Sequence, residues 1–382
     1  MKKKHLAITI LLLIVGGTTV FAQETFSFIH NGIQRNYILY IPPVEVKSAE
    51  KPLLLALHGF TQSGQTMMQF SGFNELADAN QFAVAYPDAV NTSWNVGVSG
   101  GSTADDVGFL TALIDSVAVK TAVDRNRVYA TGFSNGGFMS YRMACEAADK
   151  IAAIAAVSGT MTENTLTNCS FVRPVPVMHI HGTSDFVVPY NGLASFLSVN
   201  ATLDHWIALN QCTQTPETIL YPDFVSEGST VEASIWANCD EASEIRLLKV
   251  VNGGHTWPGY AGSMGLGNTN MDITAAVEIW NFLSRFNLGS AVGRHEAVLP
   301  EVLAIKQLNQ RNFLISSALS NAVIRLVDVS GILRFQTRVE FVAGQAMISL
   351  PDCPQGVYIL VVENGVQSQR KKILVGNKSV FP

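Results

Sequence analysis

The sequence predicts an α/β protein with a doubly wound, mainly parallel sheet, followed by a small all-β sandwich. Three observations lead to this prediction. The run Pro52–Leu57 is continuously apolar, as are strands buried on both faces of a parallel sheet. Apolar strand patterns alternate with helical patterns as far as about residue 286, which is typical of a doubly wound fold. Beyond residue 300, only short β patterns separated by turn residues follow.

The elements of the first part can be placed in order. The pair Asn31-Gly32 lies between two β patterns and is a strong hairpin signal. Asp272 is a candidate N-cap for the last helix. Strands are expected at 25–30, 35–41, 51–59, 82–86, 127–131, 151–157, 174–181 and 244–251, and helices at 66–79, 104–119, from 135 onward and at 272–286.

The domain boundaries are placed where the residue pattern of the sequence changes. Residues 1–22 are read as a signal peptide, 23–286 as the main domain, 287–300 as a linker and 301–382 as the β-sandwich. The last region contains turn signals such as Ser330-Gly331, Gln355-Gly356 and Asn364-Gly365 and no helical pattern of useful length.

The N-terminus has the three parts of a secretory signal peptide. Met1-Lys2-Lys3-Lys4 is basic, Leu6–Val20 is apolar, and Val20-Phe21-Ala22 provides small residues before Gln23. The apolar run is short for a membrane span, and an anchor helix is the alternative. No later stretch reaches 18 uninterrupted apolar residues, so no membrane span is expected in the mature chain.

The charge distribution argues against nucleic acid as a partner. The 382 residues carry a net charge of −5, which becomes −8 without the lysines of residues 1–22. The part from Gly293 onward has ten basic and six acidic residues, which leaves about −12 on residues 23–292. Such a surface repels phosphate backbones.

Export makes disulfides possible for the five cysteines. Cys145 lies near the end of the helix that begins at 135, and Cys169 precedes a core strand. Cys212 and Cys239 bracket a polar segment. We expect Cys145 to pair with Cys169 and Cys212 with Cys239, although the sequence leaves other pairings open. Cys353 has no assigned role.

Gly132-Phe133-Ser134-Asn135-Gly136 is the motif around which the main domain is organised. It follows a buried strand and begins a helix, as the nucleophile elbow of an α/β-hydrolase does. Glycines on both sides let the strand and helix approach each other while the Ser134 hydroxyl is presented to a base. Ser134 is therefore the predicted nucleophile.

Two later strand ends supply an acid and a base in the order found in α/β-hydrolases, which is Ser, Asp or Glu, then His. Asp185 follows the strand at 174–181, and His255 follows the strand at 244–251. Functional sites of open α/β sheets lie at the carboxyl ends of strands. Any one of these residues has an ordinary structural explanation, but the ordered set predicts a catalytic triad of Ser134, Asp185 and His255.

The oxyanion hole of such an enzyme needs two backbone N–H donors. Asn135, directly after the nucleophile, should provide one, and Phe60 or Thr61 the other. His58 is expected to be a structural residue that fixes this loop.

Two other groups of side chains have open interpretations. Trp94 and Trp257 are candidates for the wall of a substrate pocket, or are core residues. His179 and His181 alternate on one strand, but ordinary packing is favoured over metal binding because no third ligand is evident. No metal is expected.

The main domain resembles the secreted polyhydroxybutyrate-depolymerase-like esterases, a group that includes feruloyl esterases. The resemblance covers roughly residues 25–286. It implies Ser134, Asp185 and His255 as nucleophile, acid and base, carboxylic esters as substrates, and no cofactor. Phe60 stands where many members have cysteine. The motifs that carry it are 58–62 (HGFTQ), Trp94-Asn95, 105–109 (DDVGF), 132–137 (GFSNGG), 181–185 (HGTSD) and 254–259 (GHTWPG).

The C-terminal region resembles the sorting domain of the bacterial type IX secretion system. The segments that carry this resemblance are 328–331 (DVSG), 355–365 (QGVYILVVENG) and 371–375 (KKILV). It implies the secretion machinery as a partner and a secreted or cell-surface location. An accessory sandwich, for example one that binds carbohydrate, is the alternative.

The sequence therefore predicts a secreted serine esterase that forms an acyl-enzyme, with hydroxycinnamoyl (feruloyl) esters of plant polysaccharide as the favoured substrates. Three alternatives stay open. They are an esterase for polyhydroxyalkanoate or acetylated xylan, a serine peptidase on the same fold, and a non-catalytic surface-binding protein.

Overall fold

The computed structural model describes two regions of the chain. The first covers residues 23–43, 50–98, 100–170, 172–213, 215–223, 225–262 and 264–288. The second covers 304–307, 311–316, 321–328, 333–340, 345–350, 353–363 and 368–375. The predicted signal peptide and residues 289–300 of the predicted linker lie outside the described residues.

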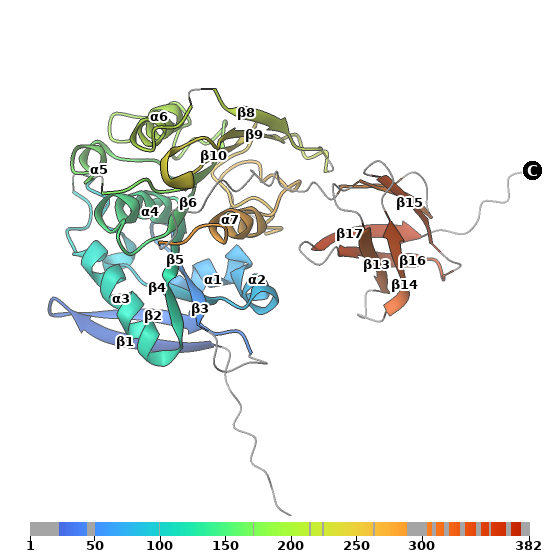
Figure 1. The fold of residues 1–382 in the computed structure, drawn as a ribbon, viewed down its shortest axis with the longest axis horizontal. Coiled ribbons are helices and arrows are strands. Elements are labelled where there is room, and N and C mark those ends of the chain that lie inside the picture. The colour runs from blue at the N-terminus through green and yellow to red at the C-terminus, as the bar shows by residue number, and fades with distance from the viewer. Residues whose placement is uncertain are drawn as a thin grey trace, which may run out of the picture.

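The described part of the first region forms one ten-stranded sheet with the order β1-β2-β4-β3-β5-β6-β7-β10-β9-β8 (Figure 1). The central strands from β4 to β10 pair in parallel, and the pairs at both edges are antiparallel. This confirms the predicted doubly wound, mainly parallel sheet. The strands are β1 (Gln23–His30), β2 (Ile33–Tyr40), β3 (Lys51–Leu57), β4 (Ala83–Pro87), β5 (Val123–Phe133), β6 (Ala153–Val157), β7 (Val177–Gly182), β8 (Glu217–Leu220), β9 (Thr230–Trp236) and β10 (Ile245–Val251).

The predicted hairpin near one edge of the sheet and the predicted buried strand at its centre are both present. Asn31 and Gly32 join β1 to β2. Their φ values are 49° and 77°, because a tight hairpin turn of this type requires positive φ at both central positions. Every residue of β3 is buried, as expected for a strand covered on both faces.

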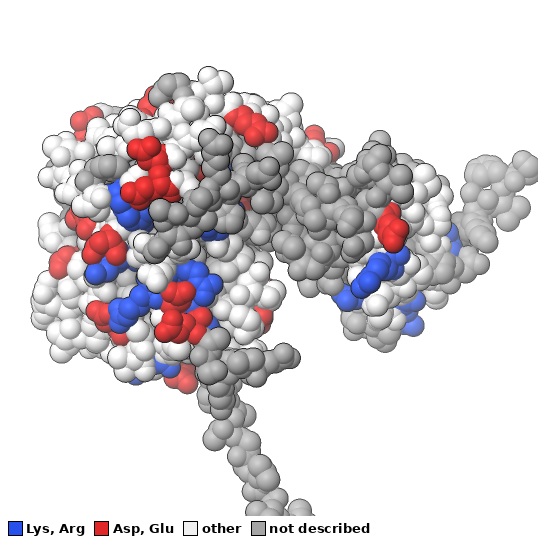
Figure 2. Space-filling view, in the orientation of Figure 1, with Lys and Arg blue, Asp and Glu red and all other residues white. Residues whose placement is uncertain are grey.

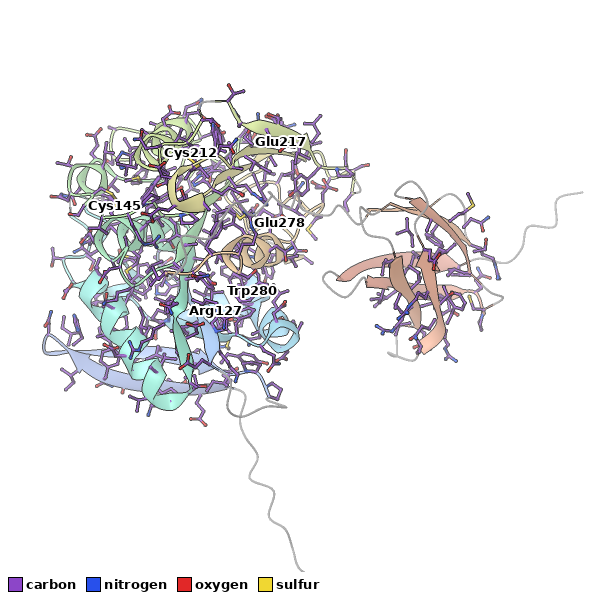
Figure 3. The ribbon with its side chains drawn as sticks, in the orientation of Figure 1. Arg127, Cys145, Cys212, Glu217, Glu278 and Trp280 are labelled. Carbon is purple, nitrogen blue, oxygen red and sulfur yellow. A yellow bond between two sulfur atoms is a disulfide. The ribbon has the colours of Figure 1, made fainter. Side chains whose placement is uncertain are left out.

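Helices cover both faces of the sheet. One core contains side chains from α3 (Asp106–Lys120), α4 (Asn135–Glu146) and α6 (Val199–Leu209). The other contains side chains from α1 (Gly64–Ser71), α2 (Phe73–Asn80) and α7 (Ala275–Leu283). Trp280 of α7 (Figure 3) stacks on Phe82 with ring centroids 3.7 Å apart.

Two helix predictions differ from the structure. The helix expected at 66–79 is two helices, because Gly72 adopts φ 77° and ends α1. Asp272 is not the cap of the last helix, which begins after Thr274. Its carboxylate instead accepts hydrogen bonds from the backbone N–H of Val225 and the side chain of Asn270.

Both predicted disulfides are present. Cys145 bonds to Cys169, and Cys212 bonds to Cys239, with Cα atoms 4.6 and 3.9 Å apart. The first bridge joins the end of α4 to the segment before β7. The second joins the segment after α6 to the segment after β9. Cys145 and Cys212 are labelled in Figure 3.

The C-terminal region is built only of antiparallel strands where it is described. One sheet has the order β11-β12-β15 and the other β14-β13-β16-β17. Side chains of both sheets, among them Phe313, Ile348, Ile324 and Leu360, share one hydrophobic core, which confirms a small β-sandwich. The strands are β11 (Ala304–Gln307), β12 (Asn312–Ser316), β13 (Asn321–Asp328), β14 (Leu333–Glu340), β15 (Gln345–Ser349), β16 (Gly356–Glu363) and β17 (Ser368–Val375).

The surface of the first region mixes charges of both signs. Figure 2 shows acidic and basic side chains next to each other on the visible face. Exposed ion pairs such as Arg125–Asp115 belong to this pattern. Among the described helices, none has the length and apolar character to cross a bilayer.

Candidate active site

Ser134 lies at a sharp turn between β5 and α4. Its φ and ψ are 54° and −117°, a strained conformation for a residue with a side chain. A Cβ on Gly132 would be 2.3 Å from the carbonyl carbon of Gly136, and a Cβ on Gly136 would be 2.1 Å from the carbonyl oxygen of Leu57. Both glycines are therefore needed for strand and helix to meet, as the motif predicted.

Asp185 and His255 come together from the ends of neighbouring strands. Asp185 follows β7 and His255 follows β10, and these strands pair in parallel. The Nδ1–H of His255 donates to Oδ2 of Asp185 at 2.7 Å. Both side chains are buried, and the His255 ring lies 4.9 Å from the ring of Phe133, the residue before Ser134. The structure thus brings a histidine–carboxylate pair beside the elbow.

The other oxygen of Asp185 is held by its own loop. Oδ1 accepts from the backbone N–H groups of Val187 at 2.9 Å and Val188 at 2.8 Å. Burial alone would raise the pKa of Asp185, but hydrogen bonds and charge interactions with His181 and His255 outweigh burial and hold this pKa below its usual range. Asp185 is therefore ionised, and its charge keeps the Nδ1 proton on His255 and leaves Nε2 as the basic nitrogen.

Two backbone N–H groups near Ser134 are available to an oxyanion. Within the described residues, neither Asn135 nor Phe60 donates its backbone N–H to another group of the protein. Thr61 differs, because its N–H donates to the carbonyl of Thr92 at 3.0 Å. Of the two candidates in this loop, the geometry therefore favours Phe60 over Thr61 as the second donor.

His58 fixes this loop, as the sequence predicted. Its Nε2 accepts from the N–H of Ala89 at 3.0 Å, so its proton is on Nδ1, which donates to the carbonyl of Gly59 at 2.7 Å. Burial lowers the pKa of His58, which keeps the ring neutral. Its own carbonyl accepts from the indole N–H of Trp94 at 2.9 Å.

The two tryptophans proposed for a pocket wall lie in the core. Trp94 and Trp257 are each 1% exposed. Trp257 packs against the rings of Phe70 and Phe73. The backbone N–H of Trp94 donates to the side-chain Oδ1 of Asn135 at 2.7 Å. Their burial favours the alternative that both are core residues, and Trp94 also holds the side chain of Asn135, the residue after Ser134.

An ion pair that the sequence analysis missed supports this side of the site. Asp106 accepts from Arg35 at 2.6 Å and from the N–H of Asn95 at 2.7 Å. Arg35 and Asp106 are 2% and 0% exposed. The sequence offered little signal, because Arg35 lies between the polar residues Gln34 and Asn36 near the start of its strand, where a charged side chain is usually exposed.

The histidines on β7 use their ring nitrogens for hydrogen bonds within the protein. His179 Nε2 lies 3.0 Å from His181 Nδ1, and the remaining nitrogens contact the hydroxyl of Tyr141 and the carbonyl of Val188. No group of three or more His, Cys, Asp or Glu side chains in the described ranges is arranged to hold a metal ion. These contacts agree with the packing interpretation.

Comparison with known proteins matches residues 94–213 to the phospholipase/carboxylesterase family. A putative esterase, NocK, of Nocardia uniformis subsp. tsuyamanensis is 29% identical over 265 residues, which cover 64% of this chain and 76% of that protein. The bifunctional acetylxylan esterase/xylanase XynS20E of Neocallimastix patriciarum is 30% identical over 267 residues (68% and 35%). Feruloyl esterase B of Piromyces equi is 29% identical over 269 residues (66% and 46%).

The match thus spans about three quarters of the first relative and less than half of the other two. The segment that contains the elbow is similar to phospholipases and carboxylesterases, and it forms part of an α/β-hydrolase fold.

Proposed function

We propose that this protein is a serine hydrolase of carboxylic esters that works through an acyl-enzyme, with hydroxycinnamoyl esters of plant polysaccharide as preferred substrates. The observation that carries the proposal is the buried His255–Asp185 pair beside the strained elbow of Ser134. The family match and the esterase names of the relatives support the enzyme class.

The reaction follows from this arrangement. Ser134 Oγ attacks the ester carbonyl carbon while His255 Nε2 takes up the hydroxyl proton. The N–H groups of Asn135 and Phe60 bind the oxyanion. The intermediate then expels the alcohol, which receives the proton from His255, and leaves the acyl group on Ser134. Water, deprotonated by His255, attacks the acyl-enzyme and releases the acid and the free serine.

Apolar side chains next to the catalytic residues favour an aromatic acyl group. Phe60, which follows Gly59 in the oxyanion loop, is 61% exposed, and Phe186, directly after Asp185, is 65% exposed. Aromatic rings at the surface are suited to bind a planar phenolic ring. Relatives named as feruloyl esterase and as acetylxylan esterase point to esters carried by plant polysaccharide.

The decisive experiment is Ser134→Ala on the full chain. Ester hydrolysis should fall by about 10⁴-fold or more, fluorophosphonate labelling should disappear, and thermal unfolding should change little. Retention of most activity would reject the catalytic assignment. Failure of the wild-type protein to take up the fluorophosphonate would favour a non-catalytic surface-binding protein.

A substrate panel separates the finer alternatives. Wild-type enzyme should have a higher kcat/KM on methyl ferulate than on acetylated xylan or short polyhydroxybutyrate. The reverse order would replace the feruloyl proposal by one of the other esters. Matched ester and amide substrates with one acyl group separate an esterase from a peptidase, and the ester should be cleaved faster.

We further propose that the protein is exported and that the C-terminal sandwich engages the type IX secretion machinery. The two disulfides support an oxidising location. Deletion of residues 301–382 should leave the enzyme active but retain it inside the cell envelope. Normal delivery of the truncated protein to the medium would contradict this role and favour an accessory domain.

A further inference from the structure

A chain of buried polar side chains leads from the helix behind the elbow to Asp185. It consists of Tyr141 on α4, His179 and His181 on β7, and the carbonyl of Val188. The contacts are 2.7 Å from Tyr141 to His179, 3.0 Å from His179 to His181 and 2.8 Å from His181 to Val188. The three side chains are at most 1% exposed, and the mechanism above uses none of them.

The carbonyl of Val188, at the end of this chain of hydrogen bonds, determines which atoms donate along it. The carbonyl of Val188 can only accept, so Nε2 of His181 carries a proton, and in the neutral ring its Nδ1 is then an acceptor. Nε2 of His179 must then donate to that Nδ1, and the hydroxyl of Tyr141 must donate to Nδ1 of His179. All hydrogen bonds therefore run in one direction, from α4 toward the loop that carries Asp185.

Val188 connects this chain to the catalytic carboxylate. Its carbonyl accepts from His181, while its own N–H donates to Oδ1 of Asp185 at 2.8 Å. Nε2 of His181 also lies 3.4 Å from Oδ2 of Asp185, the oxygen that accepts from His255. His181 thus contacts both the loop backbone and the carboxylate that this loop holds.

The surroundings keep His179 uncharged. Burial, and then the neighbouring His181, hold the pKa of His179 well below its ordinary value. On the adjacent strand, Lys249 is the register partner of His181, and it forms an ion pair with Glu232 at 2.8 Å. The ring of Tyr190 packs edge-on against His181.

We infer that His181 is a positioning residue that fixes Asp185 through Val188, and that Tyr141 and His179 hold His181 in the tautomer this requires. The inference rests on the proposed esterase function. If Tyr141, His179 and His181 only filled space, apolar residues would serve as well. Burial of a polar side chain is favourable only when it is hydrogen-bonded, as each of these three is.

The test compares two substitutions of His181 in the full chain, with kcat per active site from fluorophosphonate titration. His181→Leu removes the donor and the acceptor, whereas His181→Gln retains an amide donor and a carbonyl acceptor. His181→Leu should lower kcat about 10- to 100-fold with KM changed less than about twofold, since misplacing catalytic groups by about 1 Å costs up to about 100-fold. His181→Gln should recover most of this loss.

Proton NMR gives a readout that packing alone would not move. The downfield resonance of the Nδ1 proton shared by His255 and Asp185 should be lost or broadened in His181→Leu and return in His181→Gln. The control is His205→Leu on α6, a partly buried histidine whose ring packs edge-on against Trp206. It should leave both kcat and the resonance unchanged.

The outcomes separate the two proposals. If Ser134→Ala is inactive but His181→Leu keeps wild-type kcat and resonance, the positioning role is wrong and the esterase assignment stands. If Ser134→Ala is active, the esterase assignment itself fails. If His181→Leu does not fold, Tyr141→Phe tests the far end of the chain, where a kcat reduced at least threefold supports the inference and an unchanged kcat overturns it.

Discussion

Substitution of Asp106 by Asn should destabilise the protein strongly, although it only replaces a carboxylate by an amide of nearly the same size. In the wild type, the two carboxylate oxygens accept from Arg35 at 2.6 Å and from the N–H of Asn95 at 2.7 Å. An amide presents two N–H groups on one side, so it faces one of these donors with a donor of its own. It also leaves the guanidinium of Arg35, which is 2% exposed, without its counter-charge. Breaking such a pair costs about 3 to 5 kcal/mol.

The neighbouring residue provides a matched control. Asp105 caps α3 by accepting from the N–H of Gly108 at 2.9 Å, and its side chain is 50% exposed. Asn caps helices as well as Asp, so Asp105→Asn should cost no more than about 1 kcal/mol. Urea unfolding followed by fluorescence gives both free energies of unfolding. A loss in Asp106→Asn that equals the loss in Asp105→Asn would refute the reasoning.

A double replacement tests the cause of the loss. Arg35→Met combined with Asp106→Leu removes both charges, and should be closer to the wild type in unfolding free energy than Asp106→Asn alone. Activity should still fall, because the carboxylate no longer holds Asn95, next to the Trp94 that bonds to Asn135. Equal instability of the single and double variants would assign the loss to packing.

Three further changes have defined outcomes. Replacing Cys145 and Cys169 by Ser should lower the free energy of unfolding by about 3.4 kcal/mol, for a loop of 24 residues; denaturation under non-reducing conditions measures this, and no change would contradict it. The pKa of His179 is lowered in the folded state, so the unfolded chain binds a proton that the folded chain refuses. Stability should therefore fall as pH drops below about 6.5, by about 1.4 kcal/mol per pH unit for this group, and the slope should be shallower in His179→Phe. Gly136→Ala places a Cβ 2.1 Å from the oxygen of Leu57 and should cost about 3 kcal/mol or more; a fully active and stable variant would contradict the close packing of the elbow.

Local patterns predicted those features that depend on neighbouring residues. The apolar run of β3 and the hairpin at Asn31-Gly32 needed no knowledge of distant residues. The strands between Cys212 and Cys239 were harder to predict, because the edge strand β8 is short and mostly exposed, and its neighbour β9 buries only alternate residues. Helix α1 ended early because a single Gly72 adopted positive φ, which the periodicity of the side chains does not encode.

The candidate site shows the same division. The motifs placed Ser134, Asp185 and His255 at three strand ends, and parallel pairing brings such ends to one edge of the sheet. The choice between Phe60 and Thr61 needed the fold, because it depends on a hydrogen bond to Thr92 from another loop.

By itself, the sequence determined most strands and helices of the first region, the elbow and the order of the candidate catalytic residues along the chain, because these follow from local pattern and spacing; it did not indicate α6, β8 or β9. Only the tertiary structure decided that Trp94 and Trp257 are buried, that Asp106 pairs with Arg35, and that Tyr141, His179 and His181 join behind Asp185. The physical reason is that a buried polar group must find a partner, and the partner is chosen by which segments the folded sheet brings together.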